Sequence, residues 1–375
     1  MNFELSDEQL MLRDATRDLL AAHASLATVR AELNSDSDVD PKFWRLTADL
    51  GWSGLALPEE YGGAGQGSAE LALVAEETGR ALSRGPFLPT TIVGHAVAVA
   101  GSPRTRDEVL PLLASGPDWA SWAFAEPGEP WTPDGIHATA RREGDSLILH
   151  GCKTAVQDAG GARWLLVTAR TDDGTVVTVL VDRDSAGLTT RRQQVLDPTR
   201  NFYEVRLDGV RVQLDRALDN DACTAQQLLD YAAVVHAAES LGVLTRLLEL
   251  TVEYVGTRIQ FGKPIGSFQA VKHACADMAI LVHGARAATY YAAMAIDAGS
   301  ADAAQAACVA ASHTSAAAFE VAGRALQMHG GIGFTWEHDL HLYLRRAETD
   351  AVVFGDTAVH RDRLCTLMQQ APASA

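Results

Sequence analysis

The sequence predicts an α+β protein, mostly α, in which helical segments stand on either side of a middle β-domain. Apolar residues recur at helical spacings before about residue 118 and again after about residue 219. Between them lie short apolar or β-branched runs separated by turns rich in Gly and Asp. With 375 residues, the chain is long enough for two to three domains. We therefore expect a helical domain over 1–118, a β-barrel or sandwich over 119–218 and a helical domain over 219–375.

The composition is that of an ordinary globular protein, with 47% hydrophobic and 21% charged residues. The 48 acidic and 31 basic side chains give a net charge of −17, which argues against binding to nucleic acid or to an acidic membrane. Five scattered cysteines without a CxxC pair predict neither a metal site nor a disulfide framework; these are Cys152, Cys223, Cys275, Cys308 and Cys365. A reducing cytoplasmic location fits this pattern.

No targeting or membrane segment is expected. The first residues, MNFELSDEQL, lack the basic stretch and apolar core of a secretory signal. The Ala-rich run 301–325 is the nearest candidate for a membrane span, but Asp302, His313, Glu320 and Arg324 interrupt it. We expect this run to form a packed soluble helix.

Helix start signals mark the first domain. Ser6 and Gln9 form a capping-box pattern ahead of an apolar run, and Asp40 precedes Pro41 as an N-cap precedes the first helical residue. The acidic segment 34–40 is expected to be a loop. The glycine-rich stretch 51–65 resembles a turn rather than a phosphate-binding loop, since no strand precedes it and no GK[ST] follows.

Three runs in the middle of the chain have the composition of strands: 146–151, 164–169 and 176–181. Turn residues separate them, including Gly144, Gly174 and Gly187.

The stretch Tyr254 to Met278 places a turn between two long helices. An apolar-periodic helix is predicted to end near Arg258, stopped by Gly262 and Pro264, and a second helix begins after Ser267. The turn carries Arg258, Phe261 and Lys263, so it could bind an anionic ligand with an aromatic ring. A simple surface turn is an equally good interpretation of this stretch alone.

The same stretch resembles the signature of the acyl-CoA dehydrogenase family. The matching pattern is Tyr254-x3-Arg258-x2-Phe261-Gly262-x-Pro264-Ile265-x2-Phe268-Gln269-x-Val271, followed by Ala276-Asp277-Met278. The resemblance covers almost the whole chain and implies a C-terminal four-helix bundle. It also implies that Arg258, Phe261 and Gln269 reach the ADP half of a neighbouring subunit's FAD.

A second motif, Gln327-Met328-His329-Gly330-Gly331, belongs to the same resemblance. In the family, the corresponding glycine-rich turn approaches the flavin's ribose and pyrophosphate across the interface, which implies cofactor contacts for Gln327, Gly330 and Gly331. Without the resemblance, the glycine pair would be interpreted as a helix C-cap.

The catalytic base of the family is missing from its usual place. The family's reaction removes an α-proton from an acyl-CoA thioester with a carboxylate while the flavin accepts a hydride. Phe354 occupies the usual base position, and Ala232 occupies the position that a minority of the family uses. Glu239 and the weaker candidate Asp356 could act as displaced bases, although a residue like Glu239 is more often an interface or capping carboxylate paired with an arginine.

Positions that would contact the flavin also depart from the family. The flavin loop begins at Ala125, which lacks a hydroxyl, and Trp131 stands where a small hydroxyl should approach the ring. The next strand, 153–158, lacks the usual Trp. Asp356 and Ala358 replace a Thr and a Gln, and a carboxylate would repel a pyrophosphate.

The resemblance therefore implies the non-catalytic subunit of an α2β2 acyl-CoA dehydrogenase. Such a chain would share the adenine end of FAD with a catalytic companion, which would bind most of the acyl-CoA. Electron-transfer flavoprotein is the expected electron acceptor. Two alternatives stay open: a homomeric dehydrogenase with a displaced base, and a flavin-free scaffold of the same fold.

Overall fold

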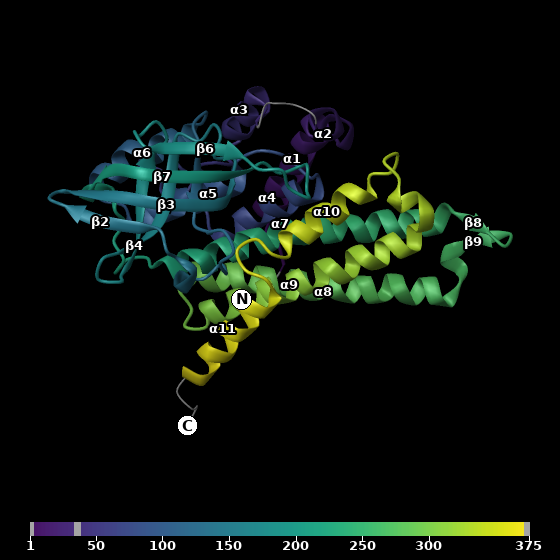
Figure 1. Cartoon of the computed structure of the whole chain (residues 1–375). Coiled ribbons are helices and arrows are strands. Elements are labelled where there is room, and N and C mark those ends of the chain that lie inside the picture. Colours follow the sequence, from purple (N-terminus) through teal and green to yellow (C-terminus); the bar gives the residue numbers. More distant parts are fainter. Residues whose placement is uncertain (1–3, 34–38, 371–375) are drawn as a thin grey trace.

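Helices flank a β-sheet in the computed structural model, which describes residues 4–33 and 39–370 (Figure 1). The predicted α+β class, mostly α, is confirmed. The sheet lies at one end of the molecule, and a hairpin that connects two long helices lies at the other (Figure 1).

Within residues 4–33 and 39–119, six helices precede the sheet. They are α1 (Asp7–His23), α2 (Leu26–Glu32), α3 (Pro41–Asp49), α4 (Ser68–Arg80), α5 (Phe87–Ala100) and α6 (Pro103–Ser115), with the 3-10 turn η1 (Glu59–Tyr61) before α4. Both sides of the predicted capping box at Ser6 and Gln9 are present, and Asp40 caps α3 with Pro41 as its first residue. Most of the predicted acidic loop, residues 34–38, lies outside the described residues.

In the described part of the chain, seven strands hydrogen-bond in one sheet. They are β1 (Ala120–Ala123), β2 (Thr139–Glu143), β3 (Ser146–Gln157), β4 (Trp164–Thr171), β5 (Val176–Asp182), β6 (Leu188–Arg192) and β7 (Phe202–Gln213), with the 3-10 turns η2 (Pro133–Gly135) and η3 (Leu214–Arg216). The order is β1-β4-β2-β3-β7-β6, and β5 pairs with β4 off this path. All three strands predicted from the sequence are present, as β3, β4 and β5.

From Ala225 to Gln370 the chain is mainly helical and contains one small hairpin. Its elements are α7 (Ala225–Thr257), β8 (Ile259–Gln260), β9 (Lys263–Pro264), η4 (Ile265–Ser267), α8 (Gln269–Asp297), α9 (Ala303–His329), η5 (Gly330–Phe334), α10 (Leu340–Asp350) and α11 (Thr357–Gln370). The predicted helix end is confirmed, because Arg258 is the C-cap of α7. None of the five cysteines, all within the described ranges, forms a disulfide.

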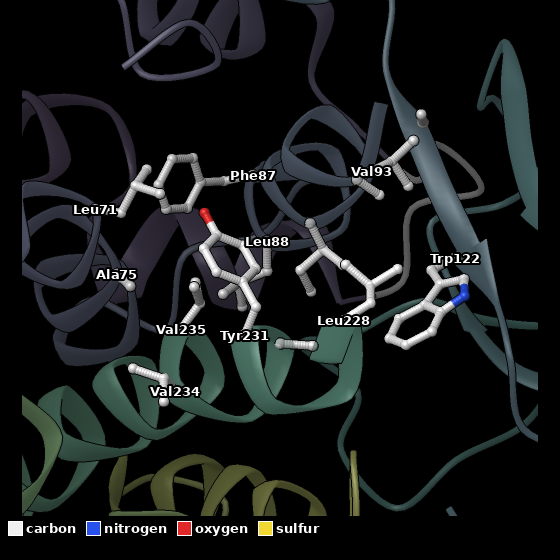
Figure 2. Packing of buried hydrophobic residues seen from close by; sticks show 14 of the residues in the cluster. Leu71, Ala75, Phe87, Leu88, Val93, Trp122, Leu228, Tyr231, Val234 and Val235 are labelled. Carbon is white, nitrogen blue, oxygen red and sulfur yellow. The ribbon is translucent and has the colours of Figure 1, made fainter. Parts of the chain in front are cut away.

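Helix α7 is the central element of the core. Within the described ranges it is the one helix long and apolar enough to cross a membrane, but 89% of its apolar window is buried inside the protein. The Ala-rich run 301–325, for which we expected a packed helix rather than a membrane span, lies mostly in α9, and α9 does not meet the same test. Figure 2 shows Leu228, Tyr231 and Val235 of α7 packing beside Phe87 and Leu88 of α5.

Two glycines let α4 and α7 approach each other. A Cβ added to Gly79 would lie 1.9 Å from the carbonyl oxygen of Glu239, and one added to Gly242 would lie 1.8 Å from that of Glu76. Any side chain at either position would therefore force the helices apart. This contact fixes the part of α7 that carries the candidate base Glu239.

Candidate functional site

An aromatic cluster occupies the region where the sequence resemblance places a base facing a flavin. The rings of Trp131 and Phe354 lie 5.0 Å apart between centroids, at 63°. Phe354 also stacks 6.2 Å from Trp122, and Trp131 stacks 6.0 Å from Phe124. Trp122 and Phe124 are buried, whereas Trp131 and Phe354 are half-buried and cover them. Because the rings of Trp131 and Phe354 are in direct contact, no space for another molecule remains between them.

The segment between α10 and α11 holds Phe354 in this cluster. Phe354 has a φ of 61°, a left-handed conformation that is unfavourable for a residue with a Cβ, and Gly355 follows with a φ of 111°. Next in the chain, Asp356 Oδ1 accepts a hydrogen bond of 2.9 Å from the Val359 amide. Asp356 is therefore the N-terminal cap of α11, and its exposed carboxylate is bound to that helix end.

The loop that follows β1 is fixed by a buried ion pair. Lys153 Nζ lies 2.6 Å from Glu126 Oε1 and donates to the carbonyl oxygen of Phe124 at 3.0 Å. The two Glu126 oxygens also accept from the amides of His137 and Ala138. Burial lowers the pKa of Lys153 to about 8, although Glu126 opposes the shift. The Lys153–Glu126 ion pair therefore anchors the start of the loop after β1, and Trp131 lies further along the same loop.

Glu239, the first candidate base, is part of a buried charge network. Arg200 Nη2 donates to Glu239 Oε2, and Arg346 Nη1 lies 3.1 Å from Glu239 Oε1. Arg200 also contacts Asp350 Oδ1 at 2.7 Å, and Arg346 contacts Asp197 Oδ2 at 2.6 Å. Both oxygens of Glu239 are thus bound to guanidinium groups, as expected for a structural carboxylate.

The network joins three parts of the chain and favours the ionised form of Asp350. Burial would raise the pKa of Asp350, but Arg200, His236 and Arg346 together outweigh this effect and lower it. Burial lowers the pKa of His236, whose Nδ1 has no hydrogen bond but lies 3.9 Å from Glu239 Oε2. His236, Glu239 and Asp350 offer ligand atoms within 4.8 Å of one another. Two guanidinium groups already compensate these carboxylates, so the cluster is a poor site for a cation.

The β8–β9 hairpin lies at the end of the bundle away from the sheet (Figure 1). Six residues expected to contact a neighbour's cofactor lie in or next to this hairpin, at the start of α8 or at the end of α9, and all are exposed: Arg258, Phe261, Gln269, Gln327, Gly330 and Gly331. Phe261 is at the tip of the β8–β9 hairpin and is 90% exposed. Tyr254 stacks on His329 at 4.4 Å, which joins the end of α7 to the end of α9. Arg324 bonds to Asp277 at 2.6 Å, which sets α9 against α8 near the same end.

The backbone of the glycine turn at Gly330 and Gly331 is not covered by other atoms of the chain. Gly330 has a φ of 59°, and a Cβ added to Gly330 or to Gly331 would meet nothing within 4 Å. The glycines are therefore not required by packing inside this chain. Open space at both positions would let another molecule approach the backbone closely.

Sequence reasoning missed the partners of several site residues. It did not identify Arg200 or Asp197 as partners in a buried network, because their pairing with α7 and α10 spans long stretches of sequence. Lys153 did carry a signal, since a lysine within an apolar strand must find a charged partner when buried. The exposed residues Phe334 and Trp336 also escaped notice.

Three family models match successive parts of the chain. They are "Acyl-CoA dehydrogenase, N-terminal domain" over residues 6–117, "Acyl-CoA dehydrogenase, middle domain" over 121–210 and "Acyl-CoA dehydrogenase, C-terminal domain" over 223–367. Together they cover all three parts of the fold.

Curated and solved relatives agree with these matches. The chain is 35% identical over 346 residues to "Acyl-CoA dehydrogenase IpdE2" of Mycobacterium tuberculosis, covering 92% of both chains. It matches the structure of a variant of the "Tcur3481-Tcur3483 steroid ACAD" with a TM-score of 0.89, 33% identity and coverage of 97% and 98%. It also matches a chain of the ChsE4-ChsE5 complex from Mycobacterium tuberculosis, with a TM-score of 0.92, 28% identity and coverage of 100% of both chains.

Proposed function

The chain belongs to the acyl-CoA dehydrogenase family, and from this membership we propose that it is the subunit of a heteromeric enzyme that lacks its own base and flavin-ring site. Its companion would carry out α,β-desaturation of an acyl-CoA thioester. The observation that carries the proposal is the direct contact between Trp131 and Phe354.

The residues at the chain's own ring position do not fit a flavin. In a working site, a flavin ring and an acyl chain would lie between the base and the flavin loop. Each pair of neighbouring layers would be separated by a van der Waals distance of about 3.5–4.0 Å. The centroids of Trp131 and Phe354 are only 5.0 Å apart. Asp356 adds a carboxylate at the N-terminus of α11, where it would repel a phosphate.

The two candidate bases are both engaged elsewhere. A base for an α-proton must be free to accept it, and its pKa must approach the working pH. Arg200 and Arg346 each bind one oxygen of Glu239, as in a structural ion pair, so the carboxylate is held by the network and not directed at a substrate. Asp356 is bound to the amide of Val359 at the surface. These contacts favour the heteromeric proposal over a homomeric enzyme with a displaced base.

The far end of the bundle, by contrast, suits the adenine end of a companion's FAD. Between Tyr254 and Ala276 the sequence has three Lys or Arg residues near the turn and no Asp or Glu, on a chain whose net charge is −17. Arg258 would face the pyrophosphate, and the open backbone at Gly330 and Gly331 would allow close approach. FAD would supply the hydride acceptor, while this chain would only help to bind it.

The relatives support the heteromeric interpretation and suggest a substrate class. Two similar structures bear paired names, and one title describes a steroid acyl-CoA dehydrogenase. We therefore extend the proposal to a bulky acyl-CoA, such as a steroid derivative, bound mainly by the companion. Electron-transfer flavoprotein would accept the electrons, and the complex would act in the cytoplasm.

The test is to purify the chain alone and together with a companion. The companion is an acyl-CoA dehydrogenase chain from the same genome that has Glu where this chain has Phe354. We expect the chain alone to be colourless and inactive. The co-expressed pair should be yellow, active and contain about one FAD for every two chains.

Two outcomes would overturn the proposal. A yellow, active homo-oligomer of this chain alone would support a displaced base. A chain that forms no complex and takes up no flavin with any such companion would support a flavin-free scaffold.

A further inference from the structure

A cavity of about 520 Å³ lies between four helices and shares no residue with the aromatic cluster or with the buried charge network. Helix α1 contributes Arg13 and Arg17, α4 contributes Ala69 and Leu73, and residues of α7 and α8 complete the wall. We call it the α1–α8 cavity. Ligand pockets in proteins have volumes of about 300–1,000 Å³, so this cavity can hold an organic molecule of moderate size.

The buried carboxylates in the wall of this cavity are already engaged. Glu76 accepts hydrogen bonds from Arg286 Nη1 at 2.8 Å, from Arg286 Nη2 at 2.6 Å and from Tyr290 Oη at 2.8 Å. Glu77 accepts from Arg17 Nε at 3.0 Å and from Arg17 Nη2 at 2.6 Å. Both oxygens of each carboxylate therefore have a donor. The remaining lining carboxylates also have partners, Glu249 in Arg80 and Arg246, and Glu4 as well.

The guanidinium groups of the cavity, by contrast, still have donors to offer. Arg17 uses Nε and Nη2 on Glu77, and Arg13 uses Nε and Nη2 on Asp14, which does not line the cavity. Within the described residues, Nη1 of neither arginine has a hydrogen-bond partner. Arginine has five N–H donors and no acceptor. A complementary ligand must therefore supply acceptor atoms.

Apolar side chains form much of the remaining wall: Leu5, Ala69, Leu73, Ala287 and Met294. The alanines on α4 and α8 carry only methyl groups, and they leave room that larger side chains would fill. An apolar wall beside guanidinium donors is complementary to an amphipathic molecule with one acceptor-rich end. A carboxylate is the end group that best matches the planar donor fork of arginine.

We propose that the α1–α8 cavity binds a bulky organic monocarboxylate, with its apolar body inside the cavity and its carboxylate at Arg13 and Arg17. A small acid such as acetate would leave most of the 520 Å³ unfilled and would bury little apolar surface. The site itself is independent of the proposed function. Only the choice of a steroid acid as the probe rests on it, because the substrate proposed above is a bulky acyl group.

The test uses the full-length chain and cholate, a steroid monocarboxylate, below its micelle concentration. Titration calorimetry measures binding, and thermal unfolding with and without cholate shows whether the folded chain is the form that binds. Ala69→Phe fills the cavity from α4, and Ala287→Phe is a second filling variant from α8. Their control is Ala22→Phe, at an exposed position of α1 outside the cavity.

A second pair of variants tests the recognition of the carboxylate. Arg13→Gln removes a charged donor at the cavity, and Arg104→Gln, at a side chain 74% exposed on α6, is the control. We expect saturable binding of cholate, weakened about 10-fold in Arg13→Gln because a charge-assisted hydrogen bond is lost. The filling variants should weaken it about 30-fold or more. Both controls should bind like the wild type, and the methyl ester of cholic acid should bind less tightly than cholate.

Three outcomes would overturn the inference. The folded wild-type chain could show no saturable binding. Binding that is unchanged in both folded filling variants would place cholate outside the cavity. Decanoate bound as tightly as cholate would identify a linear acid, not a bulky one, as the ligand. None of these measurements involves flavin or the companion, so a failure here leaves the proposed function standing, and the reverse also holds.

Discussion

Trp131 and Phe354 contact each other ring to ring, although one follows β1 in the middle domain and the other lies between α10 and α11. The first stands at the position of a flavin-loop residue and the second at the usual position of the base. The two departures from the family pattern, far apart in the sequence, therefore lie in contact in the structure. Both rings also pack on Trp122 and Phe124, and in the proposed function these side chains fill the space that a working site would need.

Restoring the carboxylate alone should not restore catalysis. Phe354→Glu places a charge against the indoles of Trp131 and Trp122, so we expect the free energy of unfolding to fall by about 1–2 kcal/mol. The isolated variant should bind no FAD and show no dehydrogenase activity. Urea unfolding and a visible spectrum check both points. Phe354→Leu is the control, with a smaller loss of about 1 kcal/mol; a yellow, active Phe354→Glu chain would contradict the proposal.

Glu239 should matter for stability and not for the reaction. Glu239→Gln leaves Arg200 and Arg346 with less compensating charge in a buried site, so we expect the free energy of unfolding to fall by about 3 kcal/mol. The complex with the companion should keep its turnover per bound FAD. Denaturation and steady-state rates at matched flavin content measure the two effects. Normal stability with lost turnover would identify Glu239 as a base after all.

His360 should make the protein less stable in mild acid. Burial, aided by Arg363, lowers the pKa of this 8% exposed residue to about 4. The unfolded chain binds a proton at a pKa of about 6.5, so it takes up more protons than the folded chain as the pH falls. We expect His360 to contribute about 2 kcal/mol of lost stability between pH 7 and pH 5.

The measurement for His360 is urea unfolding across this range. In His360→Gln the stability should depend less on pH by about that amount, because the group that titrates is gone. Equal slopes for the two proteins would show that His360 is protonated alike in the folded and unfolded states.

The parts of the fold that were predicted correctly depend on local signals. The capping box at Ser6 and the end of α7 at Arg258 follow from a few neighbouring residues, and both are confirmed. The partners of Glu239 could not be predicted, because Arg200 and Arg346 reach it only once the sheet and α10 are in place. The sequence allowed Glu239 to be a carboxylate paired with an arginine. It could not identify which arginines, because spacing in the sequence does not determine contacts between domains.

The exposure of Trp336 was missed for a different reason. An exposed Trp336 and a buried Trp164 look alike in sequence, since composition carries no information on exposure. The contact of Trp131 with Phe354 was also not foreseen, although both substitutions were noted individually. Only the fold brings the middle domain against the segment before α11.

The close crossing of α4 and α7 should be the least tolerant point of the helical core. A methyl group at Gly242 would lie 1.8 Å from the carbonyl oxygen of Glu76, which cannot move without separating the helices. We expect Gly242→Ala to lower the free energy of unfolding by about 3 kcal/mol or more, even though alanine is the better helix former. Gly323→Ala on α9 is the matched control, since a Cβ there meets nothing within 4 Å, and it should stabilise the protein by about 0.5–1 kcal/mol. Urea unfolding compares the two, and equal effects would mean that helix propensity, not the α4–α7 contact, governs both positions.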